Sequence, residues 1–213
     1  MQITFLFYEG MTALDAIGPY EILSRLPDVS VQRVSLEPGL ISTCTGLQFM
    51  AEQGIAEVTK TDVLVIPGGG KATALREYPK LLSWIKNIHA TTLWTTSICT
   101  GSLILGAAGL LVGVKATTHW AVLERLKNWG AIPTTQRVVE AGKIMTSAGV
   151  SAGIDMAFML AERLAGKTVA KSLQLGLEYD PAPPFDCGSP DKAPQAIVDA
   201  LREQLMKRFE SEN

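Results

Sequence analysis

The sequence predicts an α/β fold with an open, mostly parallel sheet that carries helices on both faces. Strand-like segments alternate with helical patterns along the chain, which is the order of elements in such sheets. The main strand-like segments are apolar throughout, as in strands whose two faces are both covered. Hydrophobic residues make up 47% of the 213 residues, enough for a sizeable core, and no repeat, low-complexity tract or linker divides the chain. We therefore expect a single domain over residues 1–213.

The first half of the chain supplies three expected strands, a hairpin and two helices. The apolar run QITFLFY at residues 2–8 predicts a buried strand. The stretch after it predicts a helix with Pro19 in its first turn, where proline fits, and with an apolar face made by Ile22, Leu23 and Leu26. The further expected elements are a strand at 29–36, a small hairpin at 40–50, a strand at 62–66 that ends in Pro-Gly-Gly-Gly, and a helix containing 81–88.

The second half continues this alternation. β-Branched and aromatic residues at 91–96 predict a strand, and helix-forming residues at 102–111 predict the helix after it. The tail at 178–190 is rich in proline and glycine, so we expect it to be irregular. The remaining expected elements are a helix that runs to Leu126, two strand-like runs within 136–147 joined by an Ala-Gly turn, an amphipathic helix over 153–166, and a last helix over about 192–209.

Charge and composition exclude several classes of partner. The 19 Lys and Arg residues against 21 Asp and Glu residues give a formal charge of −2, which predicts no binding to nucleic acid or to acidic lipid. The N-terminal residues have no basic segment followed by an apolar stretch long enough for a signal peptide or a membrane span, which predicts a cytoplasmic protein. Three cysteines without CxxC spacing and two histidines predict neither a disulfide framework nor a metal site.

Cys99 stands at the junction between a predicted strand and a predicted helix. The sequence SICTG places Ser97 and Gly101 two residues before and two residues after it, as in a nucleophile elbow. That geometry exposes the sulfur at the carboxyl end of a strand and aims a helix N-terminus at it, which stabilises a thiolate. The alternative is an inert buried cysteine packed under a helix.

Two other segments are expected to reach the same edge of the sheet. Gly68, Gly69 and Gly70 follow the strand at 62–66, and their amides can form an oxyanion hole or simply a strand-to-helix turn. Lys71 lacks the glycine spacing of a phosphate-binding loop. Asp15 follows the first strand and is either a site residue or an acidic residue at the start of a helix.

The residue after Cys99 separates two kinds of chemistry. A cysteine hydrolase needs a base, usually histidine, within hydrogen-bonding distance of the sulfur, but here Thr100 follows the cysteine. His119, in the segment ATTHW at 116–120, either approaches Cys99 or is a structural histidine. Asp15 is then the expected proton carrier.

Several segments together resemble a known family. They are LDAIGP, DVLVIPGG, SICTGSLILGAAGLLVGVKATTHW, AGVSAGID and EYDPAPPFDCGSPDKAP, and they are spread over essentially the whole chain. The sequence resembles the ThiJ/PfpI superfamily and, within it, the isonitrile hydratases. The resemblance implies a flavodoxin-like three-layer sandwich, a single class I glutamine amidotransferase-like domain, a homodimer and no cofactor. The family's catalytic cysteine falls on Cys99, its threonine on Thr100, and its acid on Asp15, where many members have glutamate. Peptidase-like relatives have histidine after the cysteine, so Thr100 argues against that activity.

The implied reaction adds water to a small-molecule isonitrile to give an N-substituted formamide. It needs a thiolate at Cys99 and a proton from Asp15 at one carbon atom, through a covalent thioimidate. Because a charged Asp15 repels a thiolate, we expect the pair to share a proton and to titrate together. Thr100, Gly68 and Gly69 are expected to orient this pair. Val150 is expected either to pack beside the elbow or to fill the core.

Three alternative functions use the same cysteine. They are a glyoxalase or deglycase-like enzyme acting on small carbonyl compounds, a ligand-sensing domain related to AraC-type regulators, and a redox sensor. The regulator needs roughly 100 further residues and a basic face for DNA, neither of which we expect here. Trp94, Trp120 and Phe185 are expected to form either an apolar pocket or part of the core. No role is expected for Cys44 or Cys187.

Overall fold

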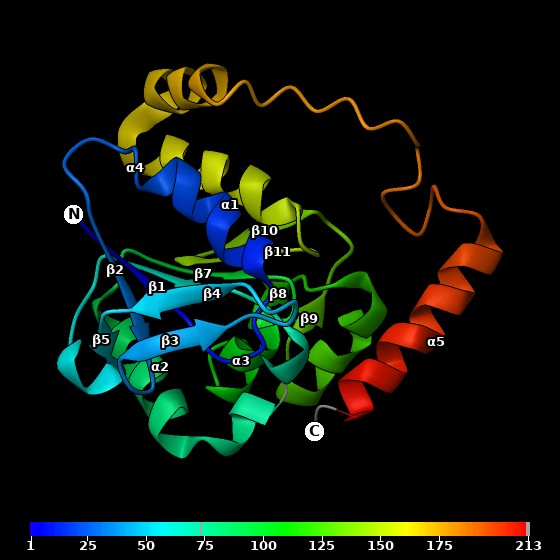
Figure 1. The fold of residues 1–213 in the computed structure, drawn as a ribbon, viewed down its shortest axis with the longest axis horizontal. Coiled ribbons are helices and arrows are strands. Elements are labelled where there is room, and N and C mark those ends of the chain that lie inside the picture. The colour runs from blue at the N-terminus through cyan, green and yellow to red at the C-terminus, as the bar shows by residue number, and fades with distance from the viewer. Residues whose placement is uncertain (73, 212–213) are drawn as a thin grey trace.

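A seven-stranded sheet forms the centre of the molecule (Figure 1). The computed structural model describes residues 1–72 and 74–211; residues 73, 212 and 213 of the expected domain lie outside the described residues. The strand order is β10-β11-β7-β6-β1-β2-β5, and only the β10–β11 pair is antiparallel. The predicted α/β class with a mostly parallel sheet is therefore confirmed. The strands are β1 (Gln2–Leu6), β2 (Ser30–Ser35), β5 (Gln53–Gly54), β6 (Val63–Ile66), β7 (Trp94–Ile98), β10 (Val138–Ala141) and β11 (Ile144–Ser147).

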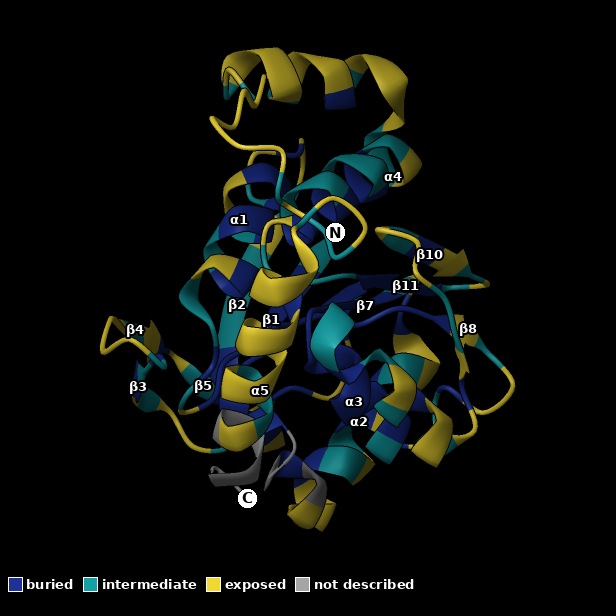
Figure 2. Cartoon of the chain, turned by 90° about the vertical axis from the view of Figure 1, so that its right-hand side faces the viewer, coloured by how far each residue is buried: buried dark blue, intermediate teal, exposed yellow. Residues whose placement is uncertain are grey.

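Helices cover both faces of this sheet. α1 (Ala13–Leu23) and α4 (Ala152–Gly176) lie on one face, and α2 (Pro79–Thr91) and α3 (Gly101–Ala107) lie on the other (Figure 1). All four residues of β6 are buried, which explains why its sequence is apolar without alternation. Figure 2 shows this buried centre in dark blue beneath a more exposed outer layer.

α1 and α4 approach each other closely because small residues line their contact. A Cβ at Gly18 would lie 2.9 Å from Ile154 Cγ1. Gly153 has a similar place, since a Cβ there would lie 3.0 Å from both Cγ atoms of Ile98 and 3.3 Å from Pro19 Cγ. The first turn of α4 is thereby packed against the end of β7, directly before Cys99.

The prediction that Pro19 lies in the first turn of a helix is wrong. α1 begins at Ala13, so Pro19 lies in the helix interior, and Asp15 occupies the first turn instead. An interior proline removes one backbone hydrogen bond, to the carbonyl of Asp15, and is normally destabilising. Here it is buried against α4, and apolar contact there offsets the loss.

Several helix ends also differ from their predicted positions. α3 ends at Ala107 rather than at residue 111, since Gly109 adopts a left-handed conformation with φ 78°. α4 continues well beyond residue 166, although Gly166 itself, with φ 84°, kinks it. The segment expected as a helix to Leu126 is a 3-10 helix over Trp120–Trp129. The last helix, α5 (Gln195–Ser211), starts after Pro194 rather than at residue 192.

Smaller elements surround the sheet. The predicted hairpin at 40–50 is confirmed as β3 (Gly39–Ser42) and β4 (Gln48–Ala51), which pair antiparallel. The antiparallel pair within 136–147 is also confirmed, as β10 and β11. Other short elements were not predicted, because segments of so few residues show no clear periodicity. These are β5, β8 (Lys115–Ala116), β9 (Ile132–Pro133), and the 3-10 turns Ile55–Glu57, Gly70–Ala72 and Ala74–Glu77.

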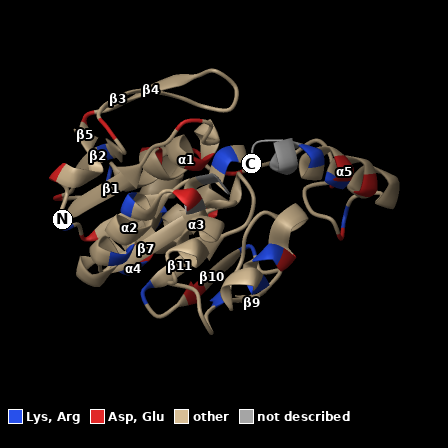
Figure 3. Cartoon of the chain, turned by 90° about the horizontal axis from the view of Figure 1, so that it is seen from below, with Lys and Arg blue, Asp and Glu red and all other residues tan. Residues whose placement is uncertain are grey.

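The segment after α4 leaves the body of the molecule and leads to α5. As predicted, residues 178–190 contain no helix or strand, and they form the orange arm at the top right of Figure 1. Leu175 and Phe185 are among the most exposed large hydrophobic side chains, at 81% and 78%. Figure 3 shows basic and acidic residues interspersed over the molecule. Among the described residues, no helix has both the length and the apolar character needed to cross a membrane.

Candidate active site

The backbone at Cys99 has the strained conformation of an elbow. Cys99 joins β7 to α3 with φ 53°, in the left-handed region that residues with a side chain rarely adopt. Gly101 makes the tight turn possible, because a Cβ there would lie 2.4 Å from the carbonyl oxygen of Ile66. The glycine that the sequence pattern requires two residues after the cysteine is therefore sterically necessary.

The Cys99 side chain is less accessible than the sequence suggested. The residue is only 5% exposed, so the expectation of an openly exposed sulfur is wrong. Burial raises the pKa of the thiol well above its ordinary value, and the negative charge of Asp15 raises it further. Backbone hydrogen bonds from Thr100 and Val150 lower the pKa but do not reverse the shift. The helix N-terminus alone therefore does not produce a resting thiolate.

Asp15 is fully buried beside the sulfur. Its Oδ2 atom accepts a 2.9 Å hydrogen bond from the Gly68 amide, and its Oδ1 atom accepts none from the described residues. Burial raises the pKa of Asp15 to about 7, although hydrogen bonds from the Gly68 amide and the Cys99 thiol partly offset this effect. The carboxyl group is therefore able to hold or release a proton near neutral pH, as the sequence argument required.

Gly68 is the point at which the three segments meet. A Cβ at this position would lie 2.8 Å from Asp15 Oδ2, 2.8 Å from Cys99 Cβ and 2.6 Å from the Thr100 nitrogen. These atoms come from α1 and from the elbow, while Gly68 itself follows β6. The structure thus brings Asp15, Cys99, Thr100 and Gly68 together at the carboxyl edge of the sheet.

Gly69 and Thr100 are bonded to each other. The Gly69 amide donates a 2.8 Å hydrogen bond to Thr100 Oγ1, and that hydroxyl donates a 2.9 Å hydrogen bond to the Gly69 carbonyl. Since the Gly68 amide is already bonded to Asp15, neither of these two amides is open to a ligand. The expectation of an oxyanion hole formed by Gly68 and Gly69 is therefore wrong: these amides hold the acid and the threonine in place.

His119 lies next to the site without bonding to the sulfur. Its Nδ1 atom accepts a 3.3 Å hydrogen bond from the Ala121 amide, and burial lowers its pKa. The ring packs against Gly149, where a Cβ would lie 2.4 Å from His119 Cδ2. The adjacent Thr118 hydroxyl donates a 2.8 Å hydrogen bond to the Cys99 carbonyl. The geometry favours the structural interpretation of this histidine.

Val150 contributes through its main chain. Its amide donates to the Cys99 sulfur, while its partly buried side chain packs against the core. The Cys99 amide in turn donates to the carbonyl groups of Ser147 and Ala148, at 3.1 and 3.3 Å. The side chain of Val150 therefore lies against the core, and the group that reaches Cys99 is the main-chain amide, which every residue except proline carries.

Tyr8 is a residue at this site that sequence reasoning missed. It is buried, and its hydroxyl donates a 3.0 Å hydrogen bond to the Pro67 carbonyl. Burial raises the pKa of Tyr8, and the charges of Asp15, Cys99 and Cys44 raise it further, so the phenol lies within electrostatic range of the pair. In the sequence it ends the apolar run of the first strand, and nothing there distinguishes it from a core residue.

The aromatic pocket expected from Trp94, Trp120 and Phe185 does not form at Cys99. Phe185 lies exposed on the arm, and Trp94 begins β7, at the end of the strand opposite Cys99. Trp120 stacks on His119 with ring centroids 5.5 Å apart. Within the described part of the chain, no group of three or more His, Cys, Asp or Glu side chains is arranged to hold a metal ion.

Comparison with known proteins connects this site with a family. The family model described as DJ-1/PfpI matches residues 1–163. An isonitrile hydratase of Pseudomonas putida is 46% identical over 204 residues, which cover 96% of this chain and 90% of that enzyme. A crystal structure of a ThiJ/PfpI family protein from Pseudomonas syringae has 36% identity and a TM-score of 0.95, covering 99% of this chain and 88% of that one.

A regulator is a more distant relative. The HTH-type transcriptional regulator CdhR of Pseudomonas aeruginosa is 28% identical over 174 residues, which cover 78% of this chain but 51% of the regulator. The family match spans the sheet, the elbow at Cys99 and the first turns of α4. By its sequence and by its fold, the chain belongs to the DJ-1/PfpI family.

Proposed function

We propose that this protein is an isonitrile hydratase, which adds water to a small-molecule isonitrile and releases an N-substituted formamide. The Pseudomonas putida relative bears that name. The observation that carries the proposal is the buried carboxyl group of Asp15 beside Cys99, with a pKa of about 7 and with no imidazole bonded to the sulfur. A terminal carbon that must accept both a nucleophile and a proton needs such a pair.

In the first step, Cys99 attacks the terminal carbon of the isonitrile. Because the thiol pKa is raised, the singly protonated pair has its proton mainly on sulfur, and the Asp15 carboxylate takes that proton as the S–C bond forms. The same proton then passes to the carbon atom. The product is a thioimidate bonded to Cys99, R–N=CH–S, with Asp15 again a carboxylate.

In the second step, water attacks the thioimidate carbon. Asp15 takes one proton from this water and passes it to the nitrogen, which gives a tetrahedral adduct with N–H, O–H and C–S bonds. The C–S bond then breaks as the C=O bond forms, and the hydroxyl proton returns to the Cys99–Asp15 pair. One water molecule has been added and the pair has regained its starting proton.

The other predicted site residues have supporting parts in this proposal. Gly68 and Thr100 hold the pair: the Gly68 amide fixes the Asp15 carboxyl, and Thr100, bonded to Gly69, fixes the turn that carries the sulfur. The Val150 amide stabilises negative charge on the sulfur. His119 packs beneath Gly149 and so supports the segment that carries this amide.

The test combines intact-protein mass spectrometry with product analysis. The purified protein is mixed with an aryl isonitrile, and in a parallel reaction with methylglyoxal. We expect a formamide from the isonitrile, a transient adduct on Cys99, and neither in Cys99→Ala. Turnover of methylglyoxal without turnover of any isonitrile would replace this proposal with the glyoxalase-like alternative.

We also propose that the protein acts in the cytoplasm as a homodimer, without a cofactor and without nucleic acid or membrane partners. The formal charge of −2 and the interspersed charges support the absence of these two partners (Figure 3). The exposed apolar side chains of Leu175 and Phe185 support self-association. Light scattering coupled to gel filtration tests the dimer, and titration with duplex DNA at defined salt tests the absence of DNA binding.

A further inference from the structure

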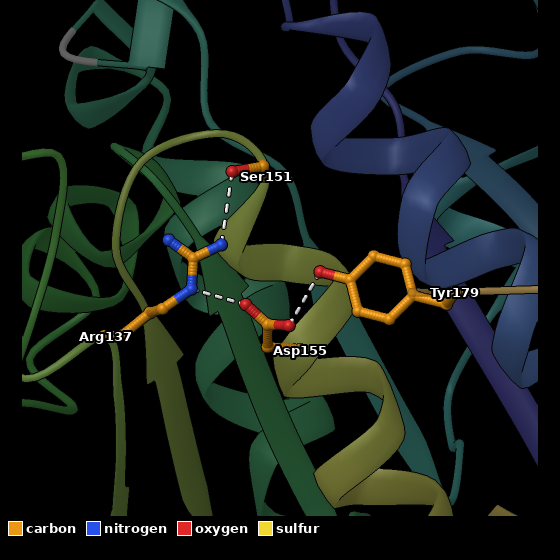
Figure 4. Close-up of polar contacts among 4 residues, drawn as sticks. All are labelled: Arg137, Ser151, Asp155 and Tyr179. Atoms are coloured by element: carbon orange, nitrogen blue, oxygen red, sulfur yellow. Dashed lines mark hydrogen bonds and ion pairs between the residues drawn. The ribbon is translucent and has the colours of Figure 1, made fainter. Parts of the chain in front are cut away.

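A polar cluster holds the start of α4 from outside the helix. It consists of Arg137, Ser151, Asp155 and Tyr179, which come from the residue before β10, the first turns of α4 and the residues after α4 (Figure 4). Arg137 Nε donates to Asp155 Oδ2, and Arg137 Nη2 donates to Ser151 Oγ at 3.2 Å. The Tyr179 hydroxyl donates to Asp155 Oδ1 at 2.8 Å. Both carboxylate oxygens of Asp155 are therefore occupied by side chains from other segments.

Ser151 does not act as an ordinary helix cap. It occupies the N-cap position of α4, but its side chain bonds to no backbone amide of the first turn. Its backbone angles, φ −68° and ψ −17°, are helical rather than extended, and its hydroxyl accepts from Arg137 instead. The start of α4 is thus held by a contact from outside the helix rather than by a cap of its own.

The main chain of Arg137 holds the same segment at its other end. The Arg137 carbonyl accepts a 2.8 Å hydrogen bond from the Ala148 amide. Arg137 therefore contacts both Ala148 and Ser151. These two residues lie on either side of Gly149 and Val150, and the Val150 amide faces Cys99. The Cys99 amide bonds to the carbonyl groups of Ser147 and Ala148, which joins this segment directly to the elbow.

On its other side, the segment has no room to move inward. The His119 ring lies so close to Gly149 that a Cβ at residue 149 would be 2.4 Å from its Cδ2 atom. Residues 148–151 are therefore confined between the imidazole and the polar cluster. Their position decides how closely the Val150 amide approaches the sulfur.

We propose that Arg137, Asp155 and Tyr179 are positioning residues, which hold residues 148–151 against Cys99 and so maintain the reactivity of its sulfur. They do not touch the reacting atoms. The ion pair between Arg137 and Asp155 is partly exposed, with 51% and 32% of the side chains accessible, and such pairs contribute little to stability. Loss of the cluster should therefore change the reactivity of Cys99 more than it changes the melting temperature.

The inference rests on the proposed function only in that Cys99 is the reacting atom, so its main test needs no turnover. The rate of Cys99 alkylation by iodoacetamide is measured against pH, with peptide mass spectrometry to separate Cys99 from Cys44 and Cys187. The titratable groups that face Cys99 are Asp15 and Tyr8, with His119 beyond Gly149. None of them is altered in the variants.

Tyr179→Phe removes the hydroxyl but keeps the ring, which packs on Phe158 with centroids 5.3 Å apart. Arg137→Gln removes the guanidinium group, which donates to both Asp155 and Ser151. Arg137→Lys keeps the positive charge but not the paired donors of the guanidinium group. We expect alkylation of Cys99 at neutral pH to slow by about 3- to 10-fold in Tyr179→Phe and Arg137→Gln, as the profile moves by up to about one pH unit. Arg137→Lys should lie between Arg137→Gln and the unmodified protein. Because Tyr179→Phe changes no charge, a shift there reports position rather than a lost positive charge.

The matched control is Arg163→Gln. Arg163 forms an ion pair of similar exposure with Glu140, at 3.2 Å, and likewise joins α4 to β10. We expect its alkylation profile to match that of the unmodified protein. Profiles of Tyr179→Phe and Arg137→Gln that superimpose on that of the unmodified protein, or an equal shift in Arg163→Gln, would overturn the inference. If the unmodified protein turns over no isonitrile, the proposed function fails while the alkylation result still decides this inference.

Discussion

The Gly68 amide and the Asp15 carboxyl group are joined by a 2.9 Å hydrogen bond that connects the loop after β6 to the first turn of α1. This bond fixes one carboxyl oxygen and leaves Oδ1 without a partner among the described residues. Asp15 is therefore held in one orientation while one oxygen stays available for a proton.

Asp15→Asn should abolish most turnover without unfolding the protein. Asparagine keeps an oxygen that can accept from the Gly68 amide, but it cannot carry the proton between sulfur and carbon. We expect formamide production to fall by at least about 100-fold, the usual range for loss of a general acid or base. Chromatographic assay of the formamide measures the effect, and circular dichroism checks the fold. Turnover within a few-fold of the unmodified enzyme would contradict the assigned role.

The pH dependence of kcat/KM should report the pair. Below the pKa of Asp15, about 7, both Asp15 and Cys99 carry a proton, so no base is available to activate the thiol. We expect kcat/KM to rise as the pH increases through about 7 and then to level off, since the thiol pKa is raised far above this range. A profile that falls over the interval from pH 6 to pH 8 would be inconsistent with this order of titration.

The free energy of unfolding should also depend on Asp15. Its pKa is higher in the folded protein, about 7, than in an unfolded chain, so folding favours the protonated form. This contribution is complete below about pH 4 and is lost as the pH rises through about 7, with a size on the order of 4 kcal/mol. Asp15→Asn should thus gain stability relative to the unmodified protein between pH 5 and pH 8, as measured by urea unfolding. An unchanged difference across that range would argue against a buried, protonated Asp15.

Gly68→Ala should disrupt the site. The new methyl group would lie within 2.6 to 2.8 Å of Asp15 Oδ2, Cys99 Cβ and the Thr100 nitrogen, so backbone atoms would have to shift. Such overpacking lowers stability by on the order of 1–3 kcal/mol. Because a displacement of about 1 Å between reacting groups slows a reaction strongly, we expect loss of about 90% or more of turnover. Gly176→Ala is the control, because a Cβ at that helical glycine meets nothing within 4 Å. Equal activities in the two variants would show that the approach at Gly68 is unimportant.

The fold was largely predictable because the strands are continuous apolar runs. β6, for example, is buried over its whole length, and its sequence, Val-Leu-Val-Ile, is apolar at every position. The elbow was predictable too, because Gly101 is sterically required two residues after Cys99. Pro19 was misplaced, since its packing against α4 comes from a segment far away in the sequence and outweighs its local preference for a first turn.

The site was only partly predictable. The sequence brought Asp15, Cys99 and Gly68 to one edge of the sheet, but it gave no sign that the Gly68 and Gly69 amides bond to side chains rather than staying open. Tyr8 looked like a core residue, and its hydrogen bond to Pro67 depends on the spacing between two strands. The contact of the Val150 amide with Cys99 is a main-chain interaction, which no pattern of side chains can indicate.

The 5% exposure of Cys99 has a consequence for which molecules react there. A sulfur with so little exposed surface is reached more readily by a narrow, linear group such as a terminal isonitrile carbon than by a broad planar electrophile or a second protein's thiol. The enzyme would then select its substrates by the width of the reacting group, and the substituent on that group would have little influence on the selection.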